Sequence, residues 1–197
     1  MPEAPSAFAT WVQEQLVPAQ RIVEFGFGNA RDSLWFARQG HTVVGYDFAE
    51  TAVSQSQGHA DSKYLSATFF ELDLYDASAS ALAGKMISST TERPAIYGRF
   101  LIHSLEESGR HNLFDLAAAT LGNGGEIYLE FRTGLDRGAK HLFGDDHFRV
   151  YLDPDIVIRE IKERGGTILH SVAARGLAVY KTEDPHVARI VARWSDV

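Results

Sequence analysis

The first two thirds of the chain alternate short apolar runs with segments of helical periodicity. Apolar runs that suit buried strands occupy residues 22–24, 42–46, 67–73, 95–104 and 126–131. Segments with apolar residues on one helical face lie between them, at residues 34–37, 49–57, 78–87 and 106–121. Strands that are buried on both faces and separated by helices are typical of a parallel sheet. The pattern therefore predicts an α/β fold.

The last third of the chain has a different pattern. Residues 153–164 predict a helix, because Asp153 can serve as its N-cap and a proline follows in the first turn. Residues 167–174 and 177–181 predict an antiparallel pair, and residues 184–194 predict an amphipathic helix. Together with the five earlier runs, these segments predict a Rossmann-like, seven-stranded, mostly parallel sheet with an antiparallel last strand and helices on both faces.

A length of 197 residues suits a single domain, which we expect to span residues 1–197. Residues 1–20 contain a lead helix with Ser6 as a possible N-cap, and its Trp11 suits either the core or a lid over a ligand. Residues 133–150 show no clear element but hold many charged and aromatic side chains. Such long irregular segments are usually functional or disordered, and we expect this one to be an acceptor-binding loop.

Residues 21–47 hold the most informative motif. An apolar run reaches Glu24, the chain turns through Gly26 and Gly28, a helix follows, and a second apolar run ends on Asp47. The glycines allow the backbone to pass close to a ligand, and a carboxylate at the end of the second strand can bind a ribose diol. A dinucleotide-binding fingerprint would require glycine at position 31, where the chain has Arg31. A carboxylate so close to the turn would also repel a phosphate and attract a cation.

The pattern E-F-G-F-G-N-A resembles motif I of the class I S-adenosylmethionine-dependent methyltransferases, with Ala30 at the third glycine position. The continuation R-D-S-L-W-F-A-R-Q-G-H-T-V-V-G-Y-D-F-A-E-T-A-V is similar to the tellurite-resistance-type branch of that family. The segments E-F-R-T, D-H-F-R-V-Y-L-D-P and G-L-A-V-Y-K-T-E-D-P-H-V-A-R resemble a subgroup associated with bacterial surface-polysaccharide enzymes.

This resemblance implies that S-adenosyl-L-methionine is the cofactor. It implies that Asp47 binds the ribose and that Asp73 and Leu74 contact the adenine edge, with Asp76 as the alternative acid. Phe48 follows the ribose acid and could lie against the adenine ring. The residues that we expect to contact the cofactor are Glu24, Gly26, Gly28, Arg31, Asp47, Phe48, Asp73, Leu74 and Arg99.

Polar residues also lie near the carboxyl ends of the fourth and fifth apolar runs, where ligands bind in open α/β sheets. We expect His103 to act as a general base, because histidine titrates nearest to neutral pH. Glu130 would orient its ring, and His147 is the alternative base. Acceptor-binding residues are expected at Arg132, Arg137, His141 and Arg149.

Two chemical alternatives remain open for these residues. A saccharide or glycan hydroxyl needs a base, whereas a phosphate or carboxylate acceptor needs arginines instead. His103, Glu130, Asp146 and His147 could instead form a divalent metal site, but their spacing matches no known metal motif, and we predict none.

The composition and net charge further limit the functional classes to which the protein can belong. The formal net charge of −7 argues against nucleic-acid binding, which requires a basic face. No apolar run approaches the roughly 20 residues that span a bilayer. The absence of cysteine fits a cytoplasmic protein.

The resemblance therefore implies an S-adenosylmethionine-dependent O-methyltransferase for a small polar acceptor, most naturally a saccharide or glycan hydroxyl or a phosphate. The alternatives are a binding module for S-adenosylmethionine without turnover and a methyltransferase for a different small molecule. The expected partner is a small-molecule or oligosaccharide acceptor, and the sequence predicts no oligomeric state.

Overall fold

The computed structural model describes residues 4–89, 93–122, 124–138 and 148–194. Seven strands are found in these segments: β1 (Ile22–Phe25), β2 (Val43–Asp47), β3 (Ala67–Glu71), β4 (Ala95–Arg99), β5 (Glu126–Arg132), β6 (Thr167–Ala174) and β7 (Val187–Arg193). The helices are α1 (Ala7–Gln13), α2 (Arg31–Arg38), α3 (Glu50–Ser62), α4 (Ala77–Ser88), α5 (Glu107–Leu121) and α6 (Pro154–Glu163). Two 3₁₀ turns, η1 (Ile102–Ser104) and η2 (Gly134–Asp136), follow β4 and β5.

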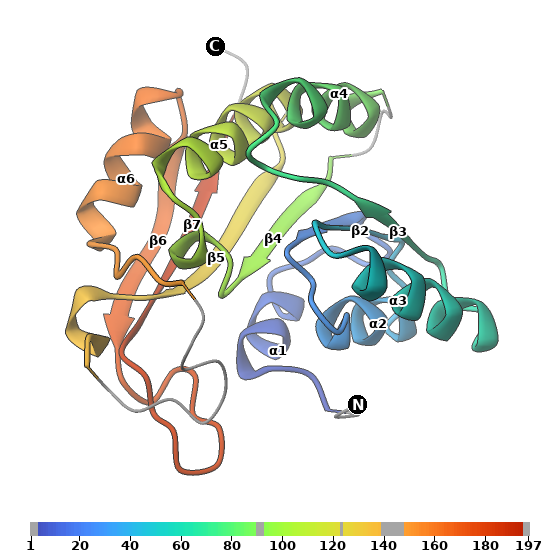
Figure 1. The fold of residues 1–197 in the computed structure, drawn as a ribbon, viewed down its shortest axis with the longest axis horizontal. Helices are drawn as coiled ribbons and strands as arrows, with labels where there is room; N and C mark the ends of the chain where they lie inside the picture. Colours follow the sequence, from blue (N-terminus) through green and yellow to red (C-terminus); the bar gives the residue numbers. More distant parts are fainter. Residues whose placement is uncertain (1–3, 90–92, 123, 139–147, 195–197) are drawn as a thin grey trace.

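The strands form one sheet in the order β3-β2-β1-β4-β5-β7-β6 (Figure 1). The first five are parallel, and β7 runs antiparallel to both β5 and β6. The strand order reverses between β1 and β4, because the chain leaves β1 toward β2 and later returns to the other side of β1. Ligands bind beyond the carboxyl ends of strands at such a point. The predicted fold class is confirmed.

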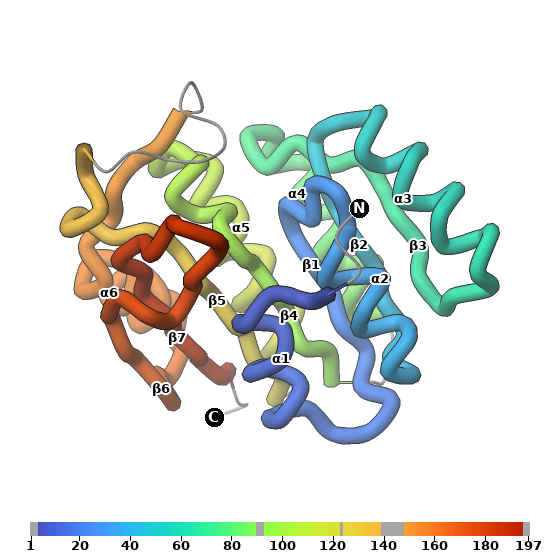
Figure 2. The backbone as a smooth tube through the Cα atoms, turned by 90° about the horizontal axis from the view of Figure 1, so that it is seen from below, coloured from blue at the N-terminus to red at the C-terminus, as the bar shows by residue number. Residues whose placement is uncertain are grey.

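Helices cover both faces of the sheet, as Figures 1 and 2 show. One apolar cluster joins the sheet to α4, α5 and α6, and a second joins the opposite face to α1, α2 and α3. Ser6 caps α1 by accepting a hydrogen bond from the Ala9 N–H at 3.0 Å, as its sequence position predicts. Trp11 is partly buried and stacks on Phe8, with ring centroids 5.9 Å apart. Within the described part of the chain, no helix has the length and apolar character needed to cross a bilayer.

The predictions for the last third of the chain are partly wrong. Residues 184–194 were expected to be helical, but residues 187–193 form β7, and this strand replaces residues 177–181 as the partner of β6. β7 lies between two other strands, so almost all of its side chains are buried. In the sequence, Arg189 suggests the polar face of an amphipathic helix. In the structure it is buried, and Glu130 on β5 neutralises its charge.

The fourth strand is also shorter than predicted. β4 ends at Arg99, and Phe100 turns the chain away with a positive φ of 57°. The Phe100 N–H still donates to the carbonyl oxygen of Glu130 at 2.7 Å, which closes the last pairing with β5. His103 therefore lies on η1 rather than on the extended strand.

Candidate active site

The turn after β1 has the backbone geometry that its glycines predict. Gly26 and Gly28 have φ values of 67° and 56°. A Cβ on Gly26 would lie 2.7 Å from Cδ1 of Leu101, whereas a Cβ on Gly28 would project into open space. Ala30 also adopts the left-handed conformation, with φ 52°, as the residue before α2. The third glycine of the motif is thus replaced by a residue that keeps the same turn at some cost in strain.

Asp47 at the end of β2 fixes the shape of this turn. Its Oδ2 accepts from the Gly28 N–H at 2.8 Å, and its Oδ1 accepts from the Ala49 N–H at 3.1 Å. The carboxylate is largely buried. It therefore connects the tip of β2 to the glycine turn and holds its own oxygens in a defined orientation.

A mainly apolar cavity of about 300 Å³ opens beside Asp47. It lies beyond the carboxyl ends of β1, β2 and β3, between the glycine turn and the segment after β4. The predicted cofactor residues that line it are Gly26, Asp47, Phe48, Asp73 and Leu74. The Phe48 side chain is 76% exposed and takes no part in the core, so its ring is available to cover a planar ligand.

A second cavity of about 470 Å³ adjoins the first, and Ser104 lines both. Four arginines contribute to its wall, with a single carboxylate, Glu183, among its described lining residues. The predicted residues that it brings together are Arg31, Arg99, His103, Arg132 and Arg149. Arg31 and Arg99 are predicted cofactor residues, and the structure places both in the wall of the second cavity and neither in the wall of the first.

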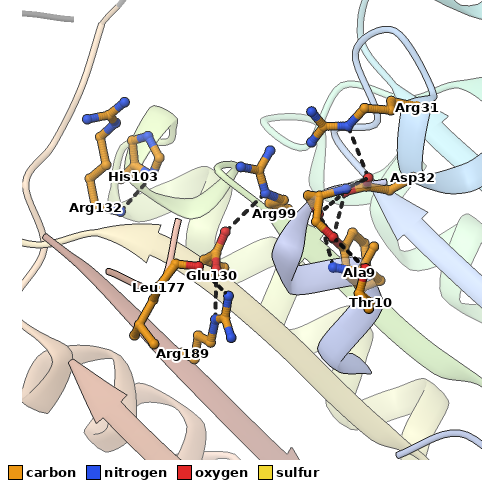
Figure 3. A network of polar contacts seen from close by, with 12 residues as sticks. Ala9, Thr10, Arg31, Asp32, Arg99, His103, Glu130, Arg132, Leu177 and Arg189 are labelled. Atoms are coloured by element: carbon orange, nitrogen blue, oxygen red, sulfur yellow. Dashed lines mark hydrogen bonds and ion pairs between the residues drawn. The ribbon is translucent and has the colours of Figure 1, made fainter. Parts of the chain in front are cut away.

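Arg31 and Arg99 are each fixed by a buried carboxylate behind them (Figure 3). Nε of Arg31 donates to Oδ1 of Asp32 at 3.1 Å, and Nε of Arg99 donates to Oε1 of Glu130 at 3.0 Å. Both carboxylates are almost completely buried. The terminal nitrogens of both guanidinium groups are directed away from these partners. This arrangement presents two pairs of N–H donors, the geometry that binds a carboxylate or a phosphate.

Asp32 also ties the lead helix to this site. Its carboxylate accepts from the Ser6 N–H at 2.8 Å, from the Ser6 hydroxyl at 2.6 Å and from the Tyr97 hydroxyl at 2.8 Å. Burial would raise the pKa of Asp32, but Arg31 and the bonds from Ser6 lower it below its ordinary value. Asp32 is therefore a buried anion that joins α1, α2 and β4.

Glu24 on β1 has the opposite protonation behaviour. Its carboxyl group is buried and accepts a hydrogen bond from the Ser33 hydroxyl. Burial raises the pKa of Glu24 to about 8, and the negative charge of Asp32 adds to the rise. Ser33, Arg99 and Arg31 counteract it only in part. At neutral pH the free protein therefore holds a proton on Glu24.

His103 is buried at the wall of the second cavity. Its Nδ1 accepts from the backbone N–H of Arg132 at 3.2 Å, so the neutral ring carries its hydrogen on Nε2. Glu130 accepts from Arg99 through Oε1 and from Arg189 through Oε2, the latter at 2.8 Å. The expectation that Glu130 orients the His103 ring is therefore wrong, because the two Glu130 oxygens bind arginines and a backbone N–H binds Nδ1 of the ring.

Other predicted residues lie elsewhere. Arg137 contributes to a separate cavity with Thr133 and Tyr151, and its guanidinium lies 5.9 Å from the Tyr151 ring centroid. The predicted residues His141 and His147 lie outside the described residues, as does Asp146 of the metal alternative. Over the described ranges, no three His, Cys, Asp or Glu side chains gather in an arrangement that could hold a metal ion.

Comparison with known proteins identifies the family. Residues 3–173 match the family model of thiopurine S-methyltransferase (TPMT). The chain belongs to the TPMT family. S-adenosylmethionine is therefore its cofactor and methyl transfer its reaction, which confirms the class predicted from the glycine motif. No curated protein matches the sequence.

Solved structures share the fold of this TPMT family member. A TehB-like methyltransferase from Corynebacterium glutamicum is 17% identical with a TM-score of 0.67, over 96% of this chain and 88% of that chain. The glycopeptide N-methyltransferase MtfA in complex with S-adenosylmethionine is 15% identical with a TM-score of 0.69, over 97% and 95%. The [4+2]-cyclase SpnF is 14% identical with a TM-score of 0.72, over 96% and 80%. At these identities the likeness concerns the fold and leaves the acceptor open.

The residues around the two cavities fit the cofactor of the family. The first cavity combines apolar walls with the oriented carboxylate of Asp47, as a nucleoside requires. Glu24 can balance an ammonium group, and the paired donors of Arg31 and Arg99 can bind a carboxylate. A nucleoside attached to an amino acid needs these three kinds of group. The strands that carry Asp47, Glu24 and Arg99 are neighbours in the sheet, and Glu24 is itself buried and lines neither cavity.

Several site residues could not be found from the sequence. Phe100, Tyr180 and Glu183 line the second cavity. Asp32 binds Arg31, and Arg189 binds Glu130, the carboxylate that holds Arg99. The one feature of the sequence that indicates these contacts is Arg189, a charged residue within a mainly apolar run. The segment 178–185 comes to the site because β7 inserts beside β5, which the predicted helix excluded.

Proposed function

We propose that this TPMT family member is an O-methyltransferase for a small polar acceptor that carries a carboxylate or phosphate group, most naturally a charged saccharide or glycan unit. Bound S-adenosylmethionine supplies a methyl group on a positively charged sulfur, which the acceptor oxygen takes by in-line displacement. The protein contributes mainly by binding both molecules in the correct orientation and by excluding water.

We assign the first cavity to the nucleoside end of the cofactor. Asp47 would bind the ribose hydroxyls, and Asp73 with the Leu74 backbone would contact the adenine. Glu24 would balance the ammonium group of the methionine end, and Arg31 and Arg99 would bind its carboxylate. The support for this assignment is the order of these groups along the sheet edge and the orientation of the two guanidinium groups.

We assign the second cavity to the acceptor. Its volume is within the range of small-molecule sites. Arg132 and Arg149 line this cavity together with Arg31 and Arg99. Arg132 is itself held by Asp136 at 2.5 Å and by Glu183, so its position is fixed before any acceptor binds. A fixed cluster of cations favours an acceptor with a negative charge.

The protonation of His103 favours an acceptor oxygen that is already ionised. A hydroxyl acceptor must lose its proton during attack, which requires a base. With its Nδ1 bound to a backbone N–H, the neutral His103 ring donates at Nε2 rather than accepting a proton there. A carboxylate or phosphate oxygen needs no base, so we propose that His103 helps to orient the acceptor instead of deprotonating it.

Matched acceptor pairs test this proposal. The enzyme would be incubated with labelled S-adenosylmethionine and with a uronic acid and its neutral hexose, or a sugar phosphate and the free sugar. We expect methyl esters or methyl phosphates from the charged member of each pair and little product from the neutral one. Mild alkali distinguishes the products of the uronic acid pair, because it hydrolyses a methyl ester of a carboxylic acid and leaves a methyl ether intact.

Two results with other acceptors would contradict the proposal. Equal methylation of charged and neutral sugars would overturn the requirement for an anion. Transfer to the sulfur of a thiopurine, the acceptor in the name of the family, in the absence of oxygen methylation would overturn the proposal for an oxygen acceptor. Arg149→Gln is the companion variant, and we expect it to raise the KM of a charged acceptor more than that of a neutral one.

Protonated Glu24 predicts that cofactor binding releases a proton. A nearby ammonium group favours the ionised carboxylate, so binding should lower the pKa of Glu24 from about 8. Cofactor affinity should then increase as the pH rises toward 8. The stability of the free protein should change in the opposite direction, because the unfolded chain loses this proton near the ordinary value of 4.5 while the folded protein retains it.

Calorimetry with S-adenosylhomocysteine in two buffers of different ionisation enthalpy measures this proton release. Glu24→Gln should abolish it, whereas Glu71→Gln, at the exposed end of β3, should not. Equal proton release from wild type and Glu24→Gln would show that another group titrates.

A further inference from the structure

Phe100 has a backbone conformation that is unusual for its side chain. Its φ of 57° lies in the left-handed region, where a bulky aromatic residue is a genuine outlier. The conformation is maintained by the hydrogen bond from the Phe100 N–H to the Glu130 carbonyl oxygen and by the turn into η1. Strained residues of this kind cluster at functional sites. A glycine would adopt this turn without strain, so the ring itself needs an explanation.

The Phe100 ring contacts three polar side chains that line the second cavity with it. The guanidinium carbon of Arg99 lies 4.1 Å from the ring centroid, and that of Arg132 lies 5.3 Å from it. The His103 ring packs edge-on, with centroids 5.6 Å apart and an interplanar angle of 71°. One aromatic side chain thus connects the arginine nearest the cofactor to the arginine and the histidine of the acceptor cavity.

The contact with Arg99 completes its orientation. The bond from Nε to Glu130 fixes one edge of the guanidinium group but leaves it free to rotate about that bond. The π face of Phe100 at 4.1 Å attracts the cation and restricts this rotation. An aliphatic side chain of similar volume would fill the space without providing that attraction.

We propose that Phe100 is a positioning residue that holds the Arg99 guanidinium in place for the carboxylate of the cofactor. This inference rests on the proposed assignment of Arg99 to that carboxylate. The left-handed backbone of Phe100 allows the ring to lie against Arg99, because in an extended continuation of β4 the side chains of two successive residues would point to opposite faces of the sheet. Arg132 and His103 pack on the same ring, so the two halves of the site share one support.

Two ligands that differ only in the amino-acid end test the inference. S-adenosylhomocysteine carries the amino-acid carboxylate, and 5′-methylthioadenosine lacks it. For Phe100→Leu we expect the affinity for S-adenosylhomocysteine to fall roughly 3- to 30-fold, and that for 5′-methylthioadenosine to change less than about twofold. Phe100→Tyr keeps the π face and should bind both ligands as the wild type does.

Phe100→Gly guards against a folding defect, because glycine adopts a positive φ without strain. It should show the same selective loss as Phe100→Leu. An equal loss for both ligands, or no loss for either, would overturn the positioning role. Arg99→Met tests the assignment of Arg99 separately from the role of Phe100. If Arg99→Met retains full S-adenosylhomocysteine affinity, the assignment of Arg99 to the cofactor carboxylate fails. If Arg99→Met shows the selective loss and the Phe100 variants do not, only the role of Phe100 fails.

Discussion

Glu130→Ala is expected to lower the free energy of unfolding by about 3–5 kcal/mol, the cost of removing one partner from a buried ion pair. Glu130 is completely buried on β5 and binds Arg99 on one side and Arg189 on the other. Burial raises the pKa of Glu130, and the two arginines oppose that rise. Without the carboxylate, two guanidinium groups would be left close together in a poorly solvated environment.

Urea unfolding of wild type and variants measures this loss. Glu126→Ala on the same strand is the matched control. Glu126 pairs with the half-exposed Arg193 and accepts a hydrogen bond from the Tyr128 hydroxyl, so its removal should cost about 1–2 kcal/mol. Glu130→Gln should lie between the two, since it keeps one acceptor oxygen. If Glu130→Ala is no more destabilising than Glu126→Ala, the arginine pair does not depend on this carboxylate.

Asp47→Ala is expected to weaken S-adenosylhomocysteine binding roughly 10- to 150-fold, because hydrogen bonds made by a charged group contribute about 1.5–3 kcal/mol. In the free protein Asp47 also accepts from the N–H groups of Gly28 and Ala49. Its removal therefore relaxes the glycine turn as well as removing the proposed ribose acceptor.

Calorimetry provides the measurement, and Asp76→Ala provides the control. Asp76 caps α4 through the N–H groups of Ser78 and Ala79, so its loss should cost helix stability but not affinity. Undiminished affinity in Asp47→Ala would remove this residue from the cofactor site. A selective loss in Asp76→Ala instead would move the adenine contact from Asp73 to the alternative acid.

The cofactor half of the site could be predicted because its information is local. Gly26, Gly28 and Asp47 belong to a single strand-turn-helix-strand unit, and each occupies the place that its chemistry requires. The carboxyl ends of parallel strands meet at one edge, so the position of Asp73 also followed from the pattern. The assignment of each residue to a part of the cofactor remains a proposal.

The acceptor half depends on contacts that local patterns do not contain. Arg189 is polar within an apolar run, and a helical period explains that run as well as a buried strand does until its partner Glu130 is known. Because residues 184–194 were predicted as a helix and not as a central strand, the sequence did not indicate that Tyr180 and Glu183 reach the site. Phe100 was hidden for another reason: its backbone conformation results from the end of β4 pairing, and no propensity indicates a left-handed phenylalanine.

The position of β7 has a consequence for biosynthesis. This strand is translated after the other six, yet it fits between β5 and β6. Until it emerges, β5 has an open edge, β6 has no neighbour in the sheet, and Glu130 lacks Arg189. The nascent chain can therefore form a cofactor-binding half well before it can form an acceptor cavity. During that interval the unpaired edge of β5 is a site for chaperone contact or misassembly.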